Sequence, residues 1–405
     1  MIDTGDTAWI LVSTALVLIM TPALAFFYGG MVRKKNVLST LNLSFIMLGV
    51  MSIHWILLGY TLAFGTSKGG LIGGFDYLGF NNVGLSPNEA YSATIPHMGF
   101  AAFQMMFAII TPALITGAFV ERVRFRTFLL FSVLWATLVY APVAHWVWAV
   151  GGIFRTMGAL DFAGGTVVHI TAGFSALAFA MVIGRRKWFG KGSLEPANIP
   201  FTMLGAGLLW MGWFGFNGGS ALGANGLAIN AVVTTNTAAA AAGVVWMFLS
   251  WRYNKPSPLG IVTGMVVGLV AITPAAGFVT PLAALAIGGI AAPISYYAIR
   301  LRQRFKLDES LDVWACHGVG GTWGALATGI FATTAVNPAG FNGLLYGNPG
   351  QLVTQAVTVV ATIAFAFTVT FVVAKTLDRL VGLRVTENEE EVGLDISEHG
   401  ERAYA

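Results

Sequence analysis

Charged residues are scarce in this sequence. Asp, Glu, Lys and Arg together make up 10% of the 405 residues, whereas 56% are hydrophobic. A soluble domain carries about 25% charged residues, so this chain does not have enough of them to cover an ordinary solvated surface. Its 50 glycines fit a membrane protein, in which small residues let helices approach closely. The composition therefore predicts an all-α polytopic membrane protein, with no soluble second domain and no nucleic-acid partner.

Cysteine is nearly absent, since Cys316 is the only one. One cysteine excludes an intrachain disulfide and any metal site built from several thiolates. A basic segment before the first apolar run is also missing, because Met1 is followed by the acidic "IDTGDTAW". We therefore predict that the first apolar run is a retained helix and not a cleaved signal peptide.

Long apolar runs, in contrast, fill most of the chain. A transmembrane helix needs about 20 mostly apolar residues. Runs of this kind predict eleven transmembrane helices, at about 8–31, 38–65, 96–119, 126–149, 161–184, 200–218, 227–250, 258–273, 281–299, 313–333 and 351–374. Stretches rich in Gly, Pro and Asn separate the neighbouring runs that no charged residue divides.

The distribution of basic residues predicts the orientation. If the N-terminus is outside, the five cytoplasmic loops and the C-terminal tail hold all but two of the 22 Lys and Arg residues, the exceptions being Lys68 and Arg155. This bias is the positive-inside rule, and one span more or fewer would destroy it. We therefore expect the N-terminus outside and the C-terminus in the cytoplasm of a cell that carries the protein in its plasma membrane.

An odd number of helices, with ionisable residues in the fifth and the tenth, predicts two five-helix halves and one long extra helix. The halves are residues 1–185 and 196–334, and the eleventh helix is 351–380. Together they form one transport domain, 1–380, followed by a cytoplasmic tail, 381–405. Inverted repeats of this kind are common in transporters. The prediction rests on the positions of the polar residues, because sequence identity between the halves is too weak to show a repeat.

The fifth and tenth helices each carry an Asp followed by a His. Asp161 stands at the outer end, and His169 lies about 12 Å deeper at 1.5 Å per residue. Asp312 stands at the cytoplasmic end, and His317 lies about 7.5 Å further in. These depths leave about 10 Å between the histidines in a core about 30 Å thick, a gap that helix tilt could close. Each histidine could instead be a packed core residue, but two at mirrored depths, each following an Asp near its own membrane face, favour a functional role.

Other uses of the histidines are less well supported by the sequence. A metal site is disfavoured because no third ligand stands at helical spacing, and no cofactor is expected. His54 and His145 are interpreted as packed or interfacial residues, and Trp55 as structural. His97 begins the third helix near the outer surface, and His399 lies in the tail.

Aromatic residues gather at the expected outer ends of several helices: Phe103, Phe107, Trp146, Trp148, Trp213, Phe214 and Phe216. One interpretation is the ordinary aromatic belt at a membrane interface. The other is a cation site, in which ring faces attract an ammonium ion. Phe103 and Phe107 share one helix face, since they are four residues apart. Composition does not choose between the two.

Six motifs resemble a known family. They are "AFFYGGMVRKKNVLS", "GAFVERVRF", "DFAGGTVVHI", "GWFGFNGGS", "CHGVGGTWGALATGIF" and "GLDISEHGERAY", in this order along nearly the whole chain. Together they resemble the ammonium transporter family (Amt/MEP/Rh), in its bacterial and archaeal branch. The eleven-helix fold of that family, with the N-terminus outside, agrees with the topology predicted above.

The resemblance implies four functional elements. The first is an outer recruitment site formed by Phe103, Phe107, Trp148 and Ser220, and the second is the carboxylate of Asp161 below it. The other two are a gate of two stacked rings, Phe107 and Phe216, and a pair of pore histidines, His169 and His317. All these positions hold the residue of the family or its usual type.

The implied function is transport of ammonium, with methylammonium as a further candidate substrate. Ammonium would be recruited outside and deprotonated, and ammonia would pass the histidines, with or without a separate transfer of the proton. A dry pore imposes a large desolvation cost on any ion, but ammonium can adopt a neutral form and potassium cannot. Neutral imidazoles suit such a pore, because each donates at one nitrogen and accepts at the other.

Asp161 is expected to act without binding the cation directly. Near the start of its helix, its carboxylate can accept backbone N–H groups and gain from the helix dipole. We expect it to remain ionised, to fix the helix end and to contribute negative potential to the outer vestibule.

The acidic tail has two interpretations. On composition alone it is a solvated, flexible terminus. The resemblance implies a folded tail that packs under a neighbouring subunit of a homotrimer, and a PII-type (GlnK) signalling protein that docks on this face.

Two other functions remain open at this stage. One is an Rh-like channel for ammonia or carbon dioxide gas, against which Trp148 and Ser220 argue. The other is an ammonium sensor or receptor that signals through the tail. An enzyme is not expected, because the spans contain no nucleophile–base pair and no metal set.

Overall fold

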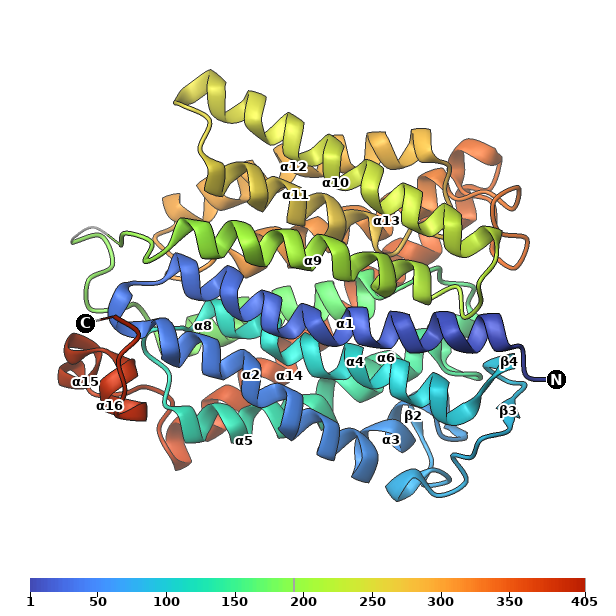
Figure 1. Ribbon diagram of the computed structural model, residues 1–405, viewed down its shortest axis with the longest axis horizontal. Helices are drawn as coiled ribbons and strands as arrows, with labels where there is room; N and C mark the ends of the chain where they lie inside the picture. The colour runs from blue at the N-terminus through green and yellow to red at the C-terminus, as the bar shows by residue number, and fades with distance from the viewer. Residues whose placement is uncertain (192–193, 405) are drawn as a thin grey trace.

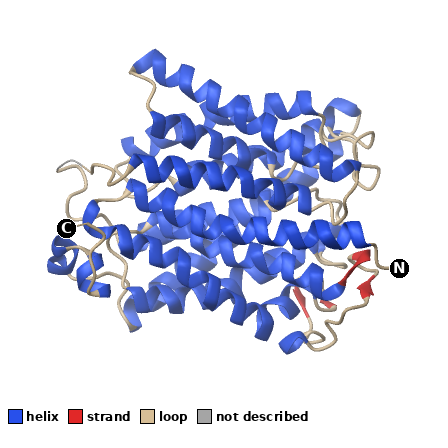
Figure 2. Ribbon diagram, viewed as in Figure 1, coloured by secondary structure: helices blue, strands red, loops and turns tan. Residues whose placement is uncertain are grey.

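The computed structural model describes residues 1–191 and 194–404 as a bundle of long helices that run side by side (Figure 1). Short strands lie at the end of the bundle where the N-terminus is found (Figure 2). The α-helices are α1 Thr4–Met31, α2 Val37–His54, α3 Tyr60–Phe64, α4 His97–Ile115, α5 Phe125–Trp135, α6 Ala141–Trp148, α7 Ile153–Thr156, α8 Thr171–Ile183, α9 Ile199–Gly219, α10 Gly226–Tyr253, α11 Pro258–Ile272, α12 Pro281–Arg304, α13 Gly320–Phe331, α14 Pro349–Leu380, α15 Glu387–Val392 and α16 Leu394–His399.

Shorter elements connect or interrupt these helices. The 3-10 turns are η1 Lys34–Asn36, η3 Leu78–Phe80, η4 Thr116–Ala118 and η8 Leu344–Tyr346, and the π-helical turns are η2 Trp55–Gly59, η5 Ala136–Tyr140, η6 Gly165–Ile170 and η7 Trp314–Val319. Two antiparallel strand pairs join β1 Ser67–Lys68 to β2 Ile72–Gly73 and β3 Pro87–Asn88 to β4 Ser92–Pro96.

Each apolar run predicted from the sequence lies on a helical segment. Within the described residues, nine helices are long and apolar enough to cross a membrane. The two remaining runs lie on α11, which has 15 residues, and on the segment Trp314–Phe331, in which η7 continues into α13. The mostly helical, multi-pass membrane architecture is thereby confirmed.

The π-helical turns change where side chains point. A π turn inserts one residue into the α pattern, so it rotates the side chains that follow around the helix axis, and such turns are frequent at functional sites. η6 contains His169, and η7 contains His317. The sequence analysis left the gap between these histidines to helix tilt. The π turns also change the direction in which the His169 and His317 side chains point, and hydrophobic periodicity does not reveal such turns.

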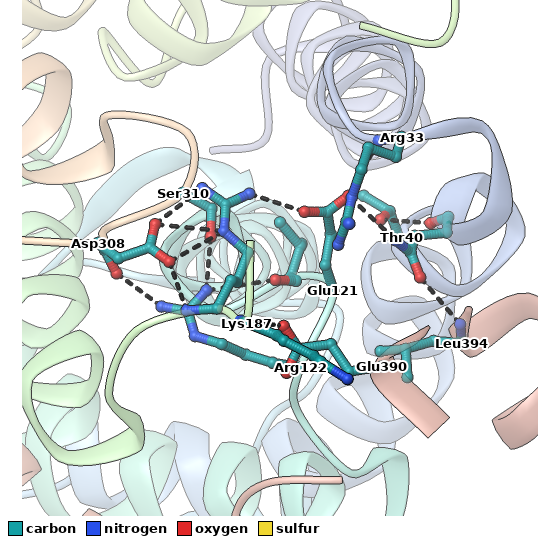
Figure 3. Close-up of polar contacts among 12 residues, drawn as sticks. Arg33, Thr40, Glu121, Arg122, Lys187, Asp308, Ser310, Glu390 and Leu394 are labelled. Carbon is teal, nitrogen blue, oxygen red and sulfur yellow. Dashed lines mark hydrogen bonds and ion pairs between the residues drawn. The ribbon is translucent and has the colours of Figure 1, made fainter. Parts of the chain in front are cut away.

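Ion pairs join distant loops at the end of the bundle away from the N-terminus (Figure 3). Glu121, between η4 and α5, pairs with Arg33 at 2.9 Å and with Arg186 at 2.7 Å. Arg186 also pairs with Asp308 at 2.7 Å. Burial opposes ionisation of Glu121, but the neighbouring guanidinium groups outweigh it and lower its pKa to about 2. We refer to these four residues, which belong to four different connections, as the loop network.

The C-terminal tail folds against the loop network and does not extend into solvent. Glu390 of α15 accepts the Lys187 backbone N–H at 2.6 Å and pairs with Arg384 at 2.6 Å. Asp395 of α16 accepts the Ser39 backbone N–H at 2.8 Å. A flexible terminus is therefore the wrong interpretation of the described tail. The tail contacts named above join α15 and α16 to Ser39, Lys187 and Arg384 of the same chain.

Candidate functional site

An outer cavity of about 150 Å³ lies where α4, α6 and α9 meet the loop that follows α6. Three of the four residues predicted for the recruitment site line it: Phe107, Trp148 and Ser220. Phe103 is fully buried and meets Phe107 edge to face, with ring centroids 5.0 Å apart. The structure therefore places Phe103 beside Phe107 in the packing around the cavity, not among the lining residues.

Other side chains that the sequence analysis did not select complete the lining: Phe64, Tyr91, Phe100, Gln104, Arg155, Phe162 and Leu222. The side-chain amide oxygen Oε1 of Gln104 is buried and has no hydrogen-bond partner among the described residues. The Ser220 hydroxyl donates to the Phe216 carbonyl at 2.8 Å, which leaves its oxygen lone pairs free to accept. A small cation with N–H donors would find aromatic faces and two acceptors here. A polar Gln inside the apolar "AAFQMMFA" was the available sequence signal for Gln104.

Two phenylalanine rings close the inner end of the outer cavity. Phe107 and Phe216 have ring centroids 4.3 Å apart, and each is about 1% exposed. Phe107 lines the outer cavity, whereas Phe216 lines the next one. The two rings are tilted by 42° and not stacked as predicted, and together they separate the outer cavity from the next one.

The structure brings His169 and His317 together behind this barrier. Their Nδ1 atoms lie 3.2 Å apart, so one imidazole donates to the other. The close crossing of their helices depends on Gly173, because a Cβ atom there would lie 2.1 Å from the Gly318 nitrogen. The ring of His169 also stacks on Trp213, with centroids 5.5 Å apart. The interfacial-belt interpretation is therefore wrong for Trp213, which packs inside the bundle.

The histidine pair lines a very small middle cavity. Its volume is about 10 Å³, and its walls are mostly aliphatic and aromatic. A water molecule needs roughly 10–15 Å³, so this segment is nearly dry. The Nε2 atom of His169 is buried and has no partner among the described residues. An inner cavity of about 310 Å³ continues from His317 past Cys316 and Asp312. The three cavities therefore lie in series.

Asp161 organises the start of the helix that carries His169. Its two carboxylate oxygens accept four backbone N–H groups at 2.6–3.1 Å, from Gly164, Gly165, Thr166 and Val167. Gly164 makes this turn with φ +111, a conformation that other residues rarely adopt. All four contacts need an acceptor, as an ionised carboxylate provides. The carboxylate is fully used by backbone, as expected for a group that does not bind the cation itself.

Two neighbours tie this turn to the rest of the site. The Trp148 indole donates to the Asp161 backbone carbonyl at 3.0 Å, which orients the ring at the outer cavity. Gln355 of α14 accepts the Leu160 N–H at 2.7 Å and donates to the Leu160 carbonyl at 2.8 Å. The long C-terminal helix thus holds the segment that leads into Asp161.

The carboxylate with the corresponding role in the tenth helix is Glu309. It accepts the Val313 N–H at 3.0 Å and the Trp314 N–H at 3.2 Å, at the start of η7. Asp312, which the sequence analysis paired with Asp161, instead forms an ion pair with Arg302 at 2.8 Å. Glu309 lies three positions before Asp312, and its side chain reaches forward along the chain to the start of the helix. Spacing alone did not show this contact.

Three further histidines are bonded within the bundle, among them His54 and His145, which the sequence analysis interpreted as packed or interfacial residues. His54 bonds to Thr137 at 2.9 Å, and His97 bonds to the Tyr60 hydroxyl at 2.5 Å. His145 is bonded through both ring nitrogens. None of the three lines the outer, middle or inner cavity. The described residues also contain no group of three or more His, Cys, Asp or Glu that could hold a metal ion.

Comparison with known proteins agrees with the geometry. Residues 8–404 match the Ammonium Transporter Family. Ammonium transporter Amt1 of Archaeoglobus fulgidus is 53% identical over 400 residues, which cover 99% of each chain. The crystal structure of Saccharomyces cerevisiae Mep2 matches with a TM-score of 0.90 at 35% identity, over 96% of this chain and 88% of that chain. A structure named Sensor Amt Protein matches with a TM-score of 0.90 at 30% identity, over 98% of each chain. This chain therefore belongs to the ammonium transporter family, a family of transporters and not of enzymes.

Proposed function

We propose that this protein moves ammonium across the membrane by recruiting the ion and passing ammonia. The observation that carries the proposal is the series of three cavities, in which an aromatic cation site is separated by a ring pair from a nearly dry segment with an unpartnered histidine nitrogen. Ring faces and the oxygens of Gln104 and Ser220 suit an ion with N–H donors.

Selectivity follows from the dry segment. An ion that entered it would lose its hydration, at a cost that a few polar atoms do not offset. Ammonium can leave its proton on water in the outer cavity and continue as ammonia, whose lone pair and N–H groups match the two faces of an imidazole. Potassium has no neutral form. We propose His169 and His317 as the residues that receive ammonia.

We further propose that all eleven helical segments cross the membrane, with the N-terminus outside and the C-terminus in the cytoplasm of a plasma-membrane protein. The positive-inside distribution supports this orientation. So does the position of the two termini at opposite ends of the bundle (Figure 1). The two π turns η6 and η7, each with a histidine and each preceded by a carboxylate that caps the turn, support an inverted repeat of residues 1–185 and 196–334.

The histidine pair provides the first test. Purified protein in liposomes is expected to give a saturable rise in internal pH after an ammonium pulse and none after potassium; a transient current accompanies it where the proton is transferred separately. Replacing His317 by Ala leaves the His169 ring without its partner, so we expect the ammonium response to fall about 10- to 100-fold. His54→Ala is the matched control, because His54 lines none of the three cavities. A His317→Ala variant with the wild-type response would contradict the proposed pore role.

A second candidate function is ammonium sensing, which the similarity to the Sensor Amt Protein favours. A sensor would bind ammonium yet give neither a current nor a change in internal pH. An electroneutral ammonia or gas channel would give no current but would alkalinise the vesicle lumen. An internal pH dye in the same liposomes therefore separates these two from charge-coupled transport.

We also propose a homotrimer that binds a PII-type protein on its cytoplasmic face. The folded tail supports this, because α15 and α16 rest on the loops that the buried loop network holds together and so offer a structured surface. Light scattering in detergent is expected to give the mass of three chains. In a pull-down, a cognate PII protein is expected to be retained in at least one nucleotide state. Absence of retention in every nucleotide state would remove this partner.

A further inference from the structure

Arg155 is a positive charge at a place where a cation is to be bound. It lies on α7 and lines the outer cavity together with Phe107 and Trp148. It is also one of the two basic residues that depart from the cytoplasmic bias of the sequence. A guanidinium group stays protonated throughout the physiological pH range. Arg155 is exposed to solvent, so the wall of the outer cavity holds a solvated but permanent charge of the same sign as ammonium.

No contact neutralises this charge in the described part of the chain. The ion pairs found there do not include Arg155, and no carboxylate side chain lines the outer cavity. Asp161 is the nearest acidic residue in the sequence, and its oxygens are occupied by backbone N–H groups. The contact that Arg155 does make is a hydrogen bond to the Trp148 carbonyl, which anchors the guanidinium beside the aromatic rings.

A fixed positive charge has two effects on ammonium bound nearby. It weakens binding of the cation by Coulomb repulsion. It also favours loss of a proton, because a neighbouring charge of the same sign disfavours the protonated form of a base. In that step one N–H bond of ammonium breaks, its electron pair stays on nitrogen, and the proton passes by way of water out of the cavity to the external solvent, away from the guanidinium.

We propose that Arg155 is a specificity-determining residue of the outer cavity: its charge keeps cation affinity low and promotes deprotonation of ammonium before the ring pair. Potassium is repelled by the same charge and has no proton to lose. Ammonium alone is converted into a neutral molecule that the charge no longer opposes. This inference rests on the proposed recruitment function and assigns a role to a residue that does not need to touch the transported nitrogen.

The test separates charge from packing with three variants. Arg155→Gln removes the charge but keeps an N–H donor for the Trp148 carbonyl, whereas Arg155→Lys keeps the charge. Lys68→Gln removes the other outer basic side chain, which is exposed on β1 and does not line the cavity. For each variant, KM and the maximal rate of internal alkalinisation driven by ammonium are measured in proteoliposomes at two ionic strengths.

Arg155→Gln is expected to lower KM about fivefold, the order of magnitude of Coulomb repulsion between two like unit charges in a partly solvated cavity. Its maximal rate of alkalinisation is expected to fall, and its KM to lose the salt dependence of wild type. Arg155→Lys and Lys68→Gln are expected to keep the wild-type KM. Tighter binding after loss of a side chain is not what a merely structural role would produce.

Two outcomes overturn the inference. In one, KM of Arg155→Gln equals or exceeds that of wild type. In the other, Arg155→Lys changes KM as much as Arg155→Gln does. A wild-type protein that gives neither a current nor a change in internal pH would instead refute the proposed transport function, so the two failures are distinguishable.

Discussion

Replacing Asp161 by Asn is expected to lower ammonium transport by about 100-fold and to reduce thermal stability. The carboxylate accepts four backbone N–H groups. An amide has one oxygen, and its NH2 group would face N–H donors that it cannot accept from. A hydrogen bond to a charged group is worth about 1.5–3 kcal/mol, so losing two of the four costs about 3–6 kcal/mol. The effect reaches the pore because the Asp161 carbonyl accepts a hydrogen bond from the Trp148 indole, and because the capped turn leads into His169.

The measurement is the liposome current together with the thermal unfolding midpoint in detergent. Asp76→Asn is the matched control, since Asp76 is an exposed loop residue that accepts one backbone N–H, from Thr66 at 2.8 Å. It is expected to behave as wild type. Full transport and ammonium affinity in Asp161→Asn would show that neither the negative charge nor the capped turn is needed, contrary to the role assigned to Asp161.

Replacing Glu121 by Gln is expected to have the second large effect, on stability. Glu121 is 2% exposed and holds Arg33 and Arg186 by ion pairs and Asn36 by a hydrogen bond at 3.0 Å. Removing one partner of a buried ion pair costs about 3–5 kcal/mol, because the remaining charge stays buried without compensation. We expect a lower thermal unfolding midpoint and faster proteolysis of the tail, whose α15 and α16 rest on the same loops.

The pH dependence of stability gives the matched readout. The pKa of Glu121 is about 2, below its ordinary value of 4.5, so its stabilising contribution is complete above pH 4.5 and is lost as pH falls through about 2. The unfolding midpoint of Glu121→Gln should therefore differ most from wild type above pH 4.5. Glu391→Gln, which removes an exposed pair with Lys187, is expected to change little. Equal effects of the two variants would refute the special role of the buried network.

The loop network illustrates what the sequence did not reveal. Arg33, Glu121, Arg186 and Asp308 lie in four different connections between helices. Composition identifies them only as charged loop residues and does not indicate that they pair with one another. Their pairing depends on how the helix ends converge. The same holds for Glu309, which caps the turn that carries His317 and which the sequence analysis did not select, and for Trp213, which was grouped with the interfacial aromatics and stacks on His169.

Local rules did predict the elements that depend on neighbouring residues. The apolar runs coincide with helical segments, because a helix in a membrane must satisfy its backbone hydrogen bonds within itself and be apolar over its length. Asp161 was expected to accept backbone N–H groups near a helix start, and it does, because capping involves residues only a few positions apart. These inferences need no knowledge of which helices are neighbours.

By itself, then, the sequence determined the membrane class, the helical segments and the carboxylate cap, since hydropathy and capping act over one helix or one turn. The family resemblance added the candidate pore residues. Only the tertiary structure decided that His169 and His317 meet at 3.2 Å, that Phe103 lies outside the cavity lining, and that Gln104 and Arg155 face it. The physical reason is that a cavity is made by side chains from several helices, and π turns and close glycine crossings set where those side chains point.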